Sequence, residues 1–233
     1  MRYRLKKVGH FPSPWRDPAL SLLLAVEIIL IFGIAPLVSA GWAGYVVLGL
    51  FQSLIGALSY FVVATRPERL LLLLSLGLMV GLTVAKSYYP VHQPFNLGFI
   101  GANLLFVVVL LRAVGQAVFA DALITVHRIR GGMVLYLTLA LLFLSLFVLL
   151  ETWQPGAFSG ISTNARQQYG QLLYFSLVTL SSTGYGDVLP LHPLARSLAT
   201  CEAITGQLSS PPCLPASSTC TCWPGAPDYW VLN

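Results

Sequence analysis

The stretch TLSSTGYGDVLP, from Thr179 to Pro190, contains the residues whose types and order most suggest chemistry. Two glycines flank a tyrosine, an aspartate follows directly, and a proline comes soon after. In a water-soluble protein such a string is typical of a turn. In a membrane the same backbone can handle ions, because glycine cheaply reaches the conformations that turn successive carbonyl oxygens to one side. The rest of the chain decides between these two interpretations.

The composition favours a membrane. Of the 233 residues, 56% are hydrophobic and 9% are charged, against about 25% charged in ordinary soluble domains. The net charge of +5 is small and scattered, which argues against a nucleic-acid partner. The sequence therefore predicts an all-α integral membrane protein surrounded by lipid, with no water-soluble domain.

Apolar runs of near-spanning length define the expected helices, since a helix needs about 20 residues to cross a bilayer. Five runs precede the motif: Ala19–Ala40, Ala43–Ala64, Leu70–Ala85, Leu97–Phe119 and Met133–Leu150. A sixth membrane helix is expected after it, over Pro193–Leu208. The run just before the motif, Gln171–Leu180, is too short to span and predicts a re-entrant helix. We therefore expect residues 19–120 to form a four-helix membrane region and 133–208 to form a separate module.

Basic residues predict the orientation. With the N-terminus inside, ten Lys and Arg residues lie at or near the cytoplasmic face and three, Lys86, Arg166 and Arg196, lie at or near the outer face. This places residues 1–18 and the linker 121–132 in the cytoplasm and makes the protein a multi-pass protein of the cell membrane. The motif then enters the membrane from outside.

With that topology, SSTGYGD resembles the selectivity-filter signature of the potassium channel family, within a helix–pore loop–helix module over Met133–Leu208. The resemblance implies K⁺ coordination by backbone carbonyls and by the Ser182 hydroxyl, in a homotetramer that needs no cofactor and is not an enzyme. The filter residues that it implies are Ser182, Thr183, Gly184, Tyr185 and Gly186, with the carbonyls of Ser182 through Tyr185 as the K⁺ ligands.

The resemblance also implies residues that support the filter from behind. Tyr185 is expected to pack against an aromatic cuff of Tyr174 and Phe175, with Thr179 in the last turn before the loop. Serine at 182 replaces the usual threonine and loses the methyl group that helps to fix the rotamer. Valine at 178 replaces the glutamate with which some members pair the aspartate, so Asp187 needs another partner, for which Tyr174 is a candidate.

Other residues in the helices leave alternatives open. The run Leu97–Phe119 contains one arginine, Arg112, where a voltage sensor needs several, so gating by such a sensor is not expected. Arg112 is at a depth where it can reach Glu27, and we predict a structural ion pair between them; the alternative is that Glu27 is a proton or ligand sensor. Glu202 either faces the ion cavity or supports the filter from behind. Gly206 is either a gating hinge or a small residue for helix packing.

The segment 209–233 is rich in proline, serine and cysteine and does not continue the inner helix. Its residues can be encoded by codons that, read two nucleotides later, continue an apolar helix ending in basic and histidine residues. We therefore predict a frameshift near Leu208, which the underlying DNA would test; the alternative is a divergent tail. Because the inner helix is apparently truncated, the alternative to a K⁺-selective channel is a non-conducting or dominant-negative membrane subunit. A solute transporter is disfavoured because the chain shows no repeated halves.

Overall fold

The computed structural model describes residues 16–42, 45–63, 66–88, 93–119 and 126–209. The first predicted membrane segment is one continuous helical stretch built from three elements: α1 (Arg16–Ile28), the π-helix η1 (Ile29–Ile34) and α2 (Ala35–Ser39). The π-helical turns fall just before Pro36, whose missing N–H removes a helix hydrogen bond. The next three helices are α3 (Tyr45–Val62), α4 (Arg66–Tyr88) and α5 (Gln93–Phe119).

The module around the motif follows. It consists of α6 (Val126–Trp153), the strand β1 (Phe158–Ser159), α7 (Ala165–Leu180), the strand β2 (Leu189–Pro190) and α8 (Pro193–Ser209). The two short strands pair antiparallel, with Phe158 opposite Pro190 and Ser159 opposite Leu189. The remaining elements are helices, so the protein is an all-α membrane protein, as the composition predicted.

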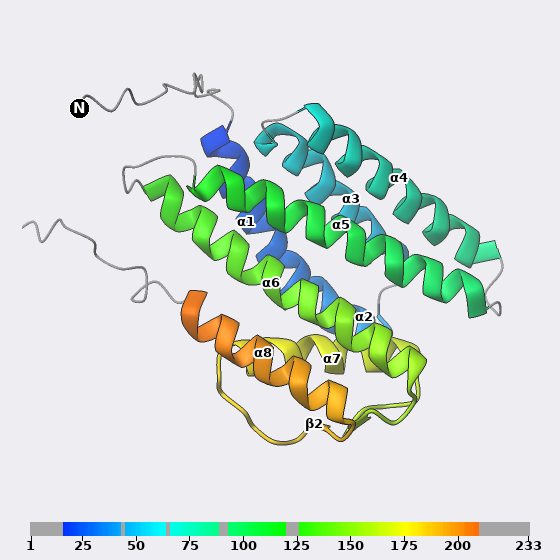
Figure 1. The fold of residues 1–233 in the computed structure, drawn as a ribbon. Coiled ribbons are helices and arrows are strands. Elements are labelled where there is room, and N and C mark those ends of the chain that lie inside the picture. Colours follow the sequence, from blue (N-terminus) through cyan, green and yellow to red (C-terminus); the bar gives the residue numbers. More distant parts are fainter. Residues whose placement is uncertain (1–15, 43–44, 64–65, 89–92, 120–125, 210–233) are drawn as a thin grey trace, which may run out of the picture.

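Helix α6 is the central element. It packs against α1 and α5 on one side and against α7 and α8 on the other. Figure 1 shows α7, α8 and β2 gathered at one end of the molecule, with α3 and α4 on the far side of α5. The four N-terminal membrane segments therefore meet the module chiefly through α6, with a further contact between α2 and α7.

Two predicted boundaries are corrected. Helix α6 begins at Val126, inside the predicted linker 121–132, so the second half of that linker is helical. Within this extension Gly131 lets α6 pack closely on α5, because a Cβ there would lie 2.5 Å from Val118 Cγ2. Helix α7 begins at Ala165 instead of Gln171, since its polar first turn resembles a loop in sequence. Residues 1–15 of the predicted N-terminus, 121–125 of the linker and the tail 210–233 lie outside the described residues.

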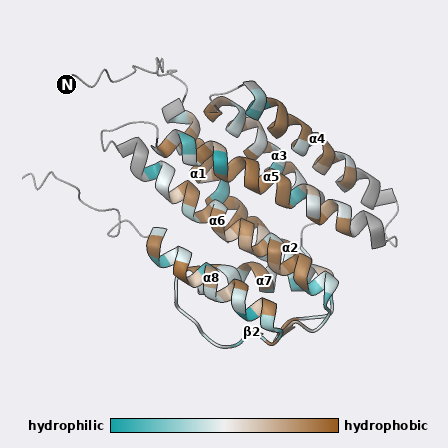
Figure 2. Cartoon of the chain, in the orientation of Figure 1, coloured by the Kyte–Doolittle hydropathy of each residue, from teal (hydrophilic) through white to brown (hydrophobic). Residues whose placement is uncertain are grey.

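The apolar surface fits lipid. Within the described residues, three helical stretches are long and apolar enough to cross a membrane, namely Pro18–Ser39, Leu97–Gln116 and Arg130–Trp153, and Val47–Val62 is a shorter apolar helix. Exposed leucines line α4, among them Leu70, Leu74 and Leu78, and Figure 2 shows hydrophobic residues along much of the long helices. Exposed apolar surface on this scale is expected where lipid, and not water, surrounds the helices.

Polar contacts join the helices inside this apolar body. Gln52 Nε2 of α3 donates to Asn103 Oδ1 of α5, and Asn103 Nδ2 donates to Ser145 Oγ of α6 at 3.1 Å. Such interhelical hydrogen bonds stabilise membrane helix packing by about 0.6 kcal/mol on average and up to about 1.7 kcal/mol. Asn103 is thus the residue that connects α3, α5 and α6.

We predict that Asn103→Leu lowers the free energy of unfolding in detergent by about 1 kcal/mol, because both partners lose their contact at once. Denaturation in mixed micelles measures this. Ser53→Ala is the matched control, since the Ser53 hydroxyl donates only to Gly49 O within its own helix. Equal stability of the two variants would show that the connection through Asn103 contributes nothing.

Candidate selectivity-filter site

The end of α7 fixes where the filter loop begins. After Leu180, the Ser182 N–H donates to Thr179 O at 2.9 Å and the Thr183 N–H donates to Val178 O at 2.9 Å. These bonds satisfy carbonyls that a helix C-terminus otherwise leaves unpaired. The last turn of α7, including the predicted support residue Thr179, therefore holds the first two residues of the loop.

The backbone of the loop alternates in conformation. Ser182, Gly184 and Gly186 have positive φ values of 55°, 60° and 81°, and Thr183 and Tyr185 between them do not. Residues 181–187 are all exposed, and the N–H groups of Gly184, Tyr185 and Gly186 donate to no group of the described chain. The loop therefore exposes successive peptide groups, which cannot stand against lipid as a single chain.

An aromatic pair flanks the loop. The Tyr185 ring stacks on the Tyr174 ring, with centroids 6.2 Å apart and planes 6° from parallel. The Tyr174 hydroxyl donates to Asp187 Oδ1 at 3.2 Å. Tyr174 was the candidate partner for Asp187 in the sequence, and the structure shows this contact. Phe175 is different from the expectation: it lies inside the molecule, with its ring centroid 5.2 Å from that of Phe147 and 5.5 Å from that of Phe158. Consecutive residues of a helix point in directions about 100° apart, so the two rings cannot form one cuff within a single chain.

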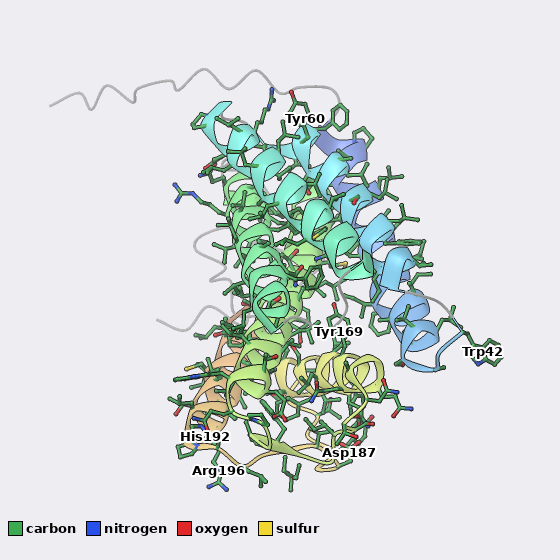
Figure 3. The ribbon with its side chains drawn as sticks, turned by 90° about the vertical axis from the view of Figure 1, so that its right-hand side faces the viewer. Trp42, Tyr60, Tyr169, Asp187, His192 and Arg196 are labelled. Carbon is green, nitrogen blue, oxygen red and sulfur yellow. The ribbon has the colours of Figure 1, made fainter. Side chains whose placement is uncertain are left out.

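The segment between α6 and α7 supports the far end of the loop. Glu151, at the end of α6, accepts the Gly156 N–H at 2.8 Å and the Phe158 N–H at 3.2 Å. Gly160 has φ +79°, and a Cβ there would lie 2.1 Å from Asp187 O. The paired strands β1 and β2 connect the same two segments. Figure 3 shows Asp187, His192 and Arg196 together at this end of the molecule, opposite Tyr60. Neither Glu151 nor Gly160 was predicted from the sequence. The one signal for Glu151 is that an acid follows a long apolar run.

Helix α8 packs along the back of α7 through a small number of close contacts. Glu202 is fully buried, and its Oε1 accepts a hydrogen bond from Ser176 Oγ at 2.5 Å. One turn later, a Cβ on Gly206 would lie 2.1 Å from Leu180 O. Of the two roles considered for Glu202, the structure therefore favours support from behind. The structure also shows that Gly206 allows α8 to pack against the backbone of α7. A gating hinge at Gly206 stays a prediction.

The predicted ion pair between Glu27 and Arg112 is not formed. Glu27 is buried between α1 and α6, where its Oε1 accepts a hydrogen bond from Thr138 Oγ1 at 2.8 Å. Arg112 Nε lies 3.3 Å from Glu68 Oε1 of α4, which Gln116 also contacts at 2.7 Å. The predicted pair rested on depth along the helices, which says nothing about the direction in which a side chain points around its helix.

Comparisons with known proteins cover this module. Residues 131–211 match the model of a family described as an ion channel. The chain is also similar to the inward rectifier potassium channel Kirbac3.1 of Paramagnetospirillum magnetotacticum, with 33% identity over 69 residues, which is 30% of this chain and 20% of that protein. The chain thus spans about a fifth of the length of this relative. No solved structure gives a significant match.

The two matches support a potassium channel family for this part of the chain. They make this part of the chain similar to ion channels, and they fix neither the ion ligands nor the number of subunits. Among the described residues, no group of three or more His, Cys, Asp or Glu side chains is placed to hold a metal ion. The coordination of K⁺ by the carbonyls of Ser182 through Tyr185 and by the Ser182 hydroxyl stays a prediction.

We predict that Gly206→Ala destabilises the fold by about 1–3 kcal/mol, because the new methyl group must push α8 away from the backbone of Leu180. Gly77→Ala in α4 is the matched control, since a Cβ there meets nothing within 4 Å. It should be neutral or more stable, as alanine is a better helix former than glycine by about 1 kcal/mol. Unfolding of both variants in detergent measures the difference. A Gly206→Ala variant as stable as wild type would contradict the close approach of α7 and α8.

Proposed function

We propose that this chain is a subunit of a K⁺-selective channel, with Ser182, Thr183, Gly184 and Tyr185 providing the ion ligands. The observation that carries the proposal is the alternation of positive φ values at Ser182, Gly184 and Gly186. An alternating backbone of this kind is what brings successive carbonyl oxygens to one side of a strand. Rings of such oxygens replace the hydration shell of a permeant cation. The ion channel match over residues 131–211 supports the same interpretation.

A pore requires several copies of the loop around one axis, and we propose a homotetramer. In one chain the loop 181–187 is exposed and its central N–H groups have no partner in the described chain. Copies arranged around an axis would face these groups toward ions, water and each other instead of lipid. The same arrangement would leave Tyr185 and Tyr174 stacked between the filter and the surrounding helices.

The proposed orientation places the N-terminus in the cytoplasm and the Asp187 end of the module outside, following the distribution of basic residues. Gating by an arginine-rich sensor is not part of the proposal. Within the described part of α5 the one basic residue is Arg112, and it is paired with Glu68. An arginine held by a neighbouring helix in this way is a structural contact, and a single charge gives little voltage dependence.

The alternative is a non-conducting membrane subunit, and one observation favours it. Helix α8 is described to Ser209, and its 17 residues cover about 26 Å at the rise of an α-helix. A hydrocarbon core is about 30 Å thick. The family match ends near the same place, at residue 211. If the segment after α8 does not line a cavity, the chain assembles without conducting.

Uptake of radioactive rubidium into liposomes that hold KCl tests the proposal. We predict uptake by the full chain that external Na⁺ does not suppress, and a loss of at least about tenfold in Gly184→Ala, because a side chain is strained at φ +60°. Gly77→Ala is again the matched control, with uptake equal to wild type. A second version of the chain is made in which the residues after Leu208 are replaced by those that the alternative reading frame encodes. Uptake by that version alone would favour the non-conducting subunit, and uptake by neither would refute the channel.

A further inference from the structure

The innermost predicted ligand, Ser182, is held in an unusual way. Its φ of 55° makes it the one residue other than glycine with a positive φ in the described chain. Serine has no methyl group on Cβ, so the three staggered χ1 rotamers of its hydroxyl are similar in energy. Threonine at the same place would be restricted at χ1. A serine hydroxyl that serves as an ion ligand therefore needs a restraint from elsewhere.

Gln207 of α8 makes that contact. Its Nε2 donates a hydrogen bond to Ser182 Oγ at 2.7 Å, across 25 positions of sequence. A hydroxyl oxygen has two lone pairs and one proton. The amide donor occupies one lone pair and fixes the direction of the other, which stays available to a cation. The contact thus orients the oxygen of Ser182 without blocking it as a ligand.

The backbone around Gln207 is well fixed. The preceding residue, Gly206, lies against Leu180 O so closely that no Cβ fits between them. One turn earlier, Glu202 contacts the Ser176 hydroxyl of α7, whose oxygen also lies 2.9 Å from Ala140 O of α6. These two contacts are four residues apart on both helices, so they set the register of α8 against α7. That register places Gln207 beside the start of the loop.

We propose that Gln207 is a positioning residue for the innermost ion site: its amide group holds the Ser182 hydroxyl in the rotamer that offers oxygen to the cation, a restraint that threonine would supply through its own methyl group. The inference deepens the proposed function and rests on it, since it assigns a role within the same filter.

The test measures K⁺ binding and ion flux separately. The first readout is the K⁺ concentration that gives half-maximal protection of the full chain against heat in detergent, because a ligand that binds only the folded state stabilises it. We expect Gln207→Leu to raise that concentration about fivefold, as loss of one net hydrogen bond implies. In a Ser182→Thr background the same substitution should change it by less than about twofold relative to Ser182→Thr alone, because the methyl group replaces the restraint. The strain of threonine at a positive φ is common to both of these variants and cancels in the comparison.

The second readout is rubidium uptake in the presence of excess Na⁺, which should fall in Gln207→Leu and recover in the double variant. Thr200→Val is the matched control on α8, since its hydroxyl donates only to Arg196 O of the same helix. A fivefold shift that Ser182→Thr does not reduce would assign Gln207 a merely structural role and overturn the inference, as would no shift at all. Protection by K⁺ without uptake in wild type refutes conduction alone, and the half-maximal concentrations still decide the role of Gln207. Absence of both protection and uptake refutes the filter and the inference together.

Discussion

A peptide group without a hydrogen-bond partner cannot face lipid, and this constraint governs the module between α6 and α8. The loop 181–187 is exposed, with three successive N–H groups unpaired within the described chain. Such a loop is stable in a membrane only where protein encloses it or where it lines water and ions. The short helix α7, the paired strands and α8 are the elements that hold it there.

Each of these elements constrains the loop by a different kind of contact. At the start, the carbonyls of the last turn of α7 accept the N–H groups of Ser182 and Thr183. At the end, Gly160 lets one backbone pass directly against that of Asp187, and Glu151 keeps the intervening turn in place. From behind, α8 approaches the end of α7 until backbone meets backbone at Gly206. The residues that shape the loop are therefore glycines, which let two backbones touch, and polar residues, which hydrogen-bond the backbone of the neighbouring turns.

Much of the fold could be predicted from the sequence, because lipid makes long apolar runs helical with few alternatives. The helices lie where the runs Ala19–Ala40 to Met133–Leu150 predicted them, and α8 ends one residue beyond the predicted Leu208. Positive φ at Gly184 and Gly186 also follows from residue type. The start of α7 was missed because its first turn is polar.

What the sequence could not supply is the rotation of each helix about its axis. Apolar residues surround these helices on nearly every side, so the pattern does not say which face meets protein and which meets lipid. Glu27 faces Thr138 and Arg112 faces Glu68 for this reason, instead of facing each other. Gln207 and Glu151 were missed likewise, since their partners lie on other elements and nothing in their own neighbourhood marks them.

The polar contacts of the N-terminal helices give these helices a structural role in the module. Glu27 of α1 contacts Thr138 of α6, and Asn103 of α5 contacts Ser145 two turns further along α6. Both contacts lie in an otherwise apolar interior, where a polar group without its partner costs more than the contact itself gains. They therefore fix the rotation of α6, the helix that carries Glu151 at its end. Because Glu151 holds the turn that packs on Asp187, the placement of the N-terminal helices and the shape of the filter loop are connected through one helix.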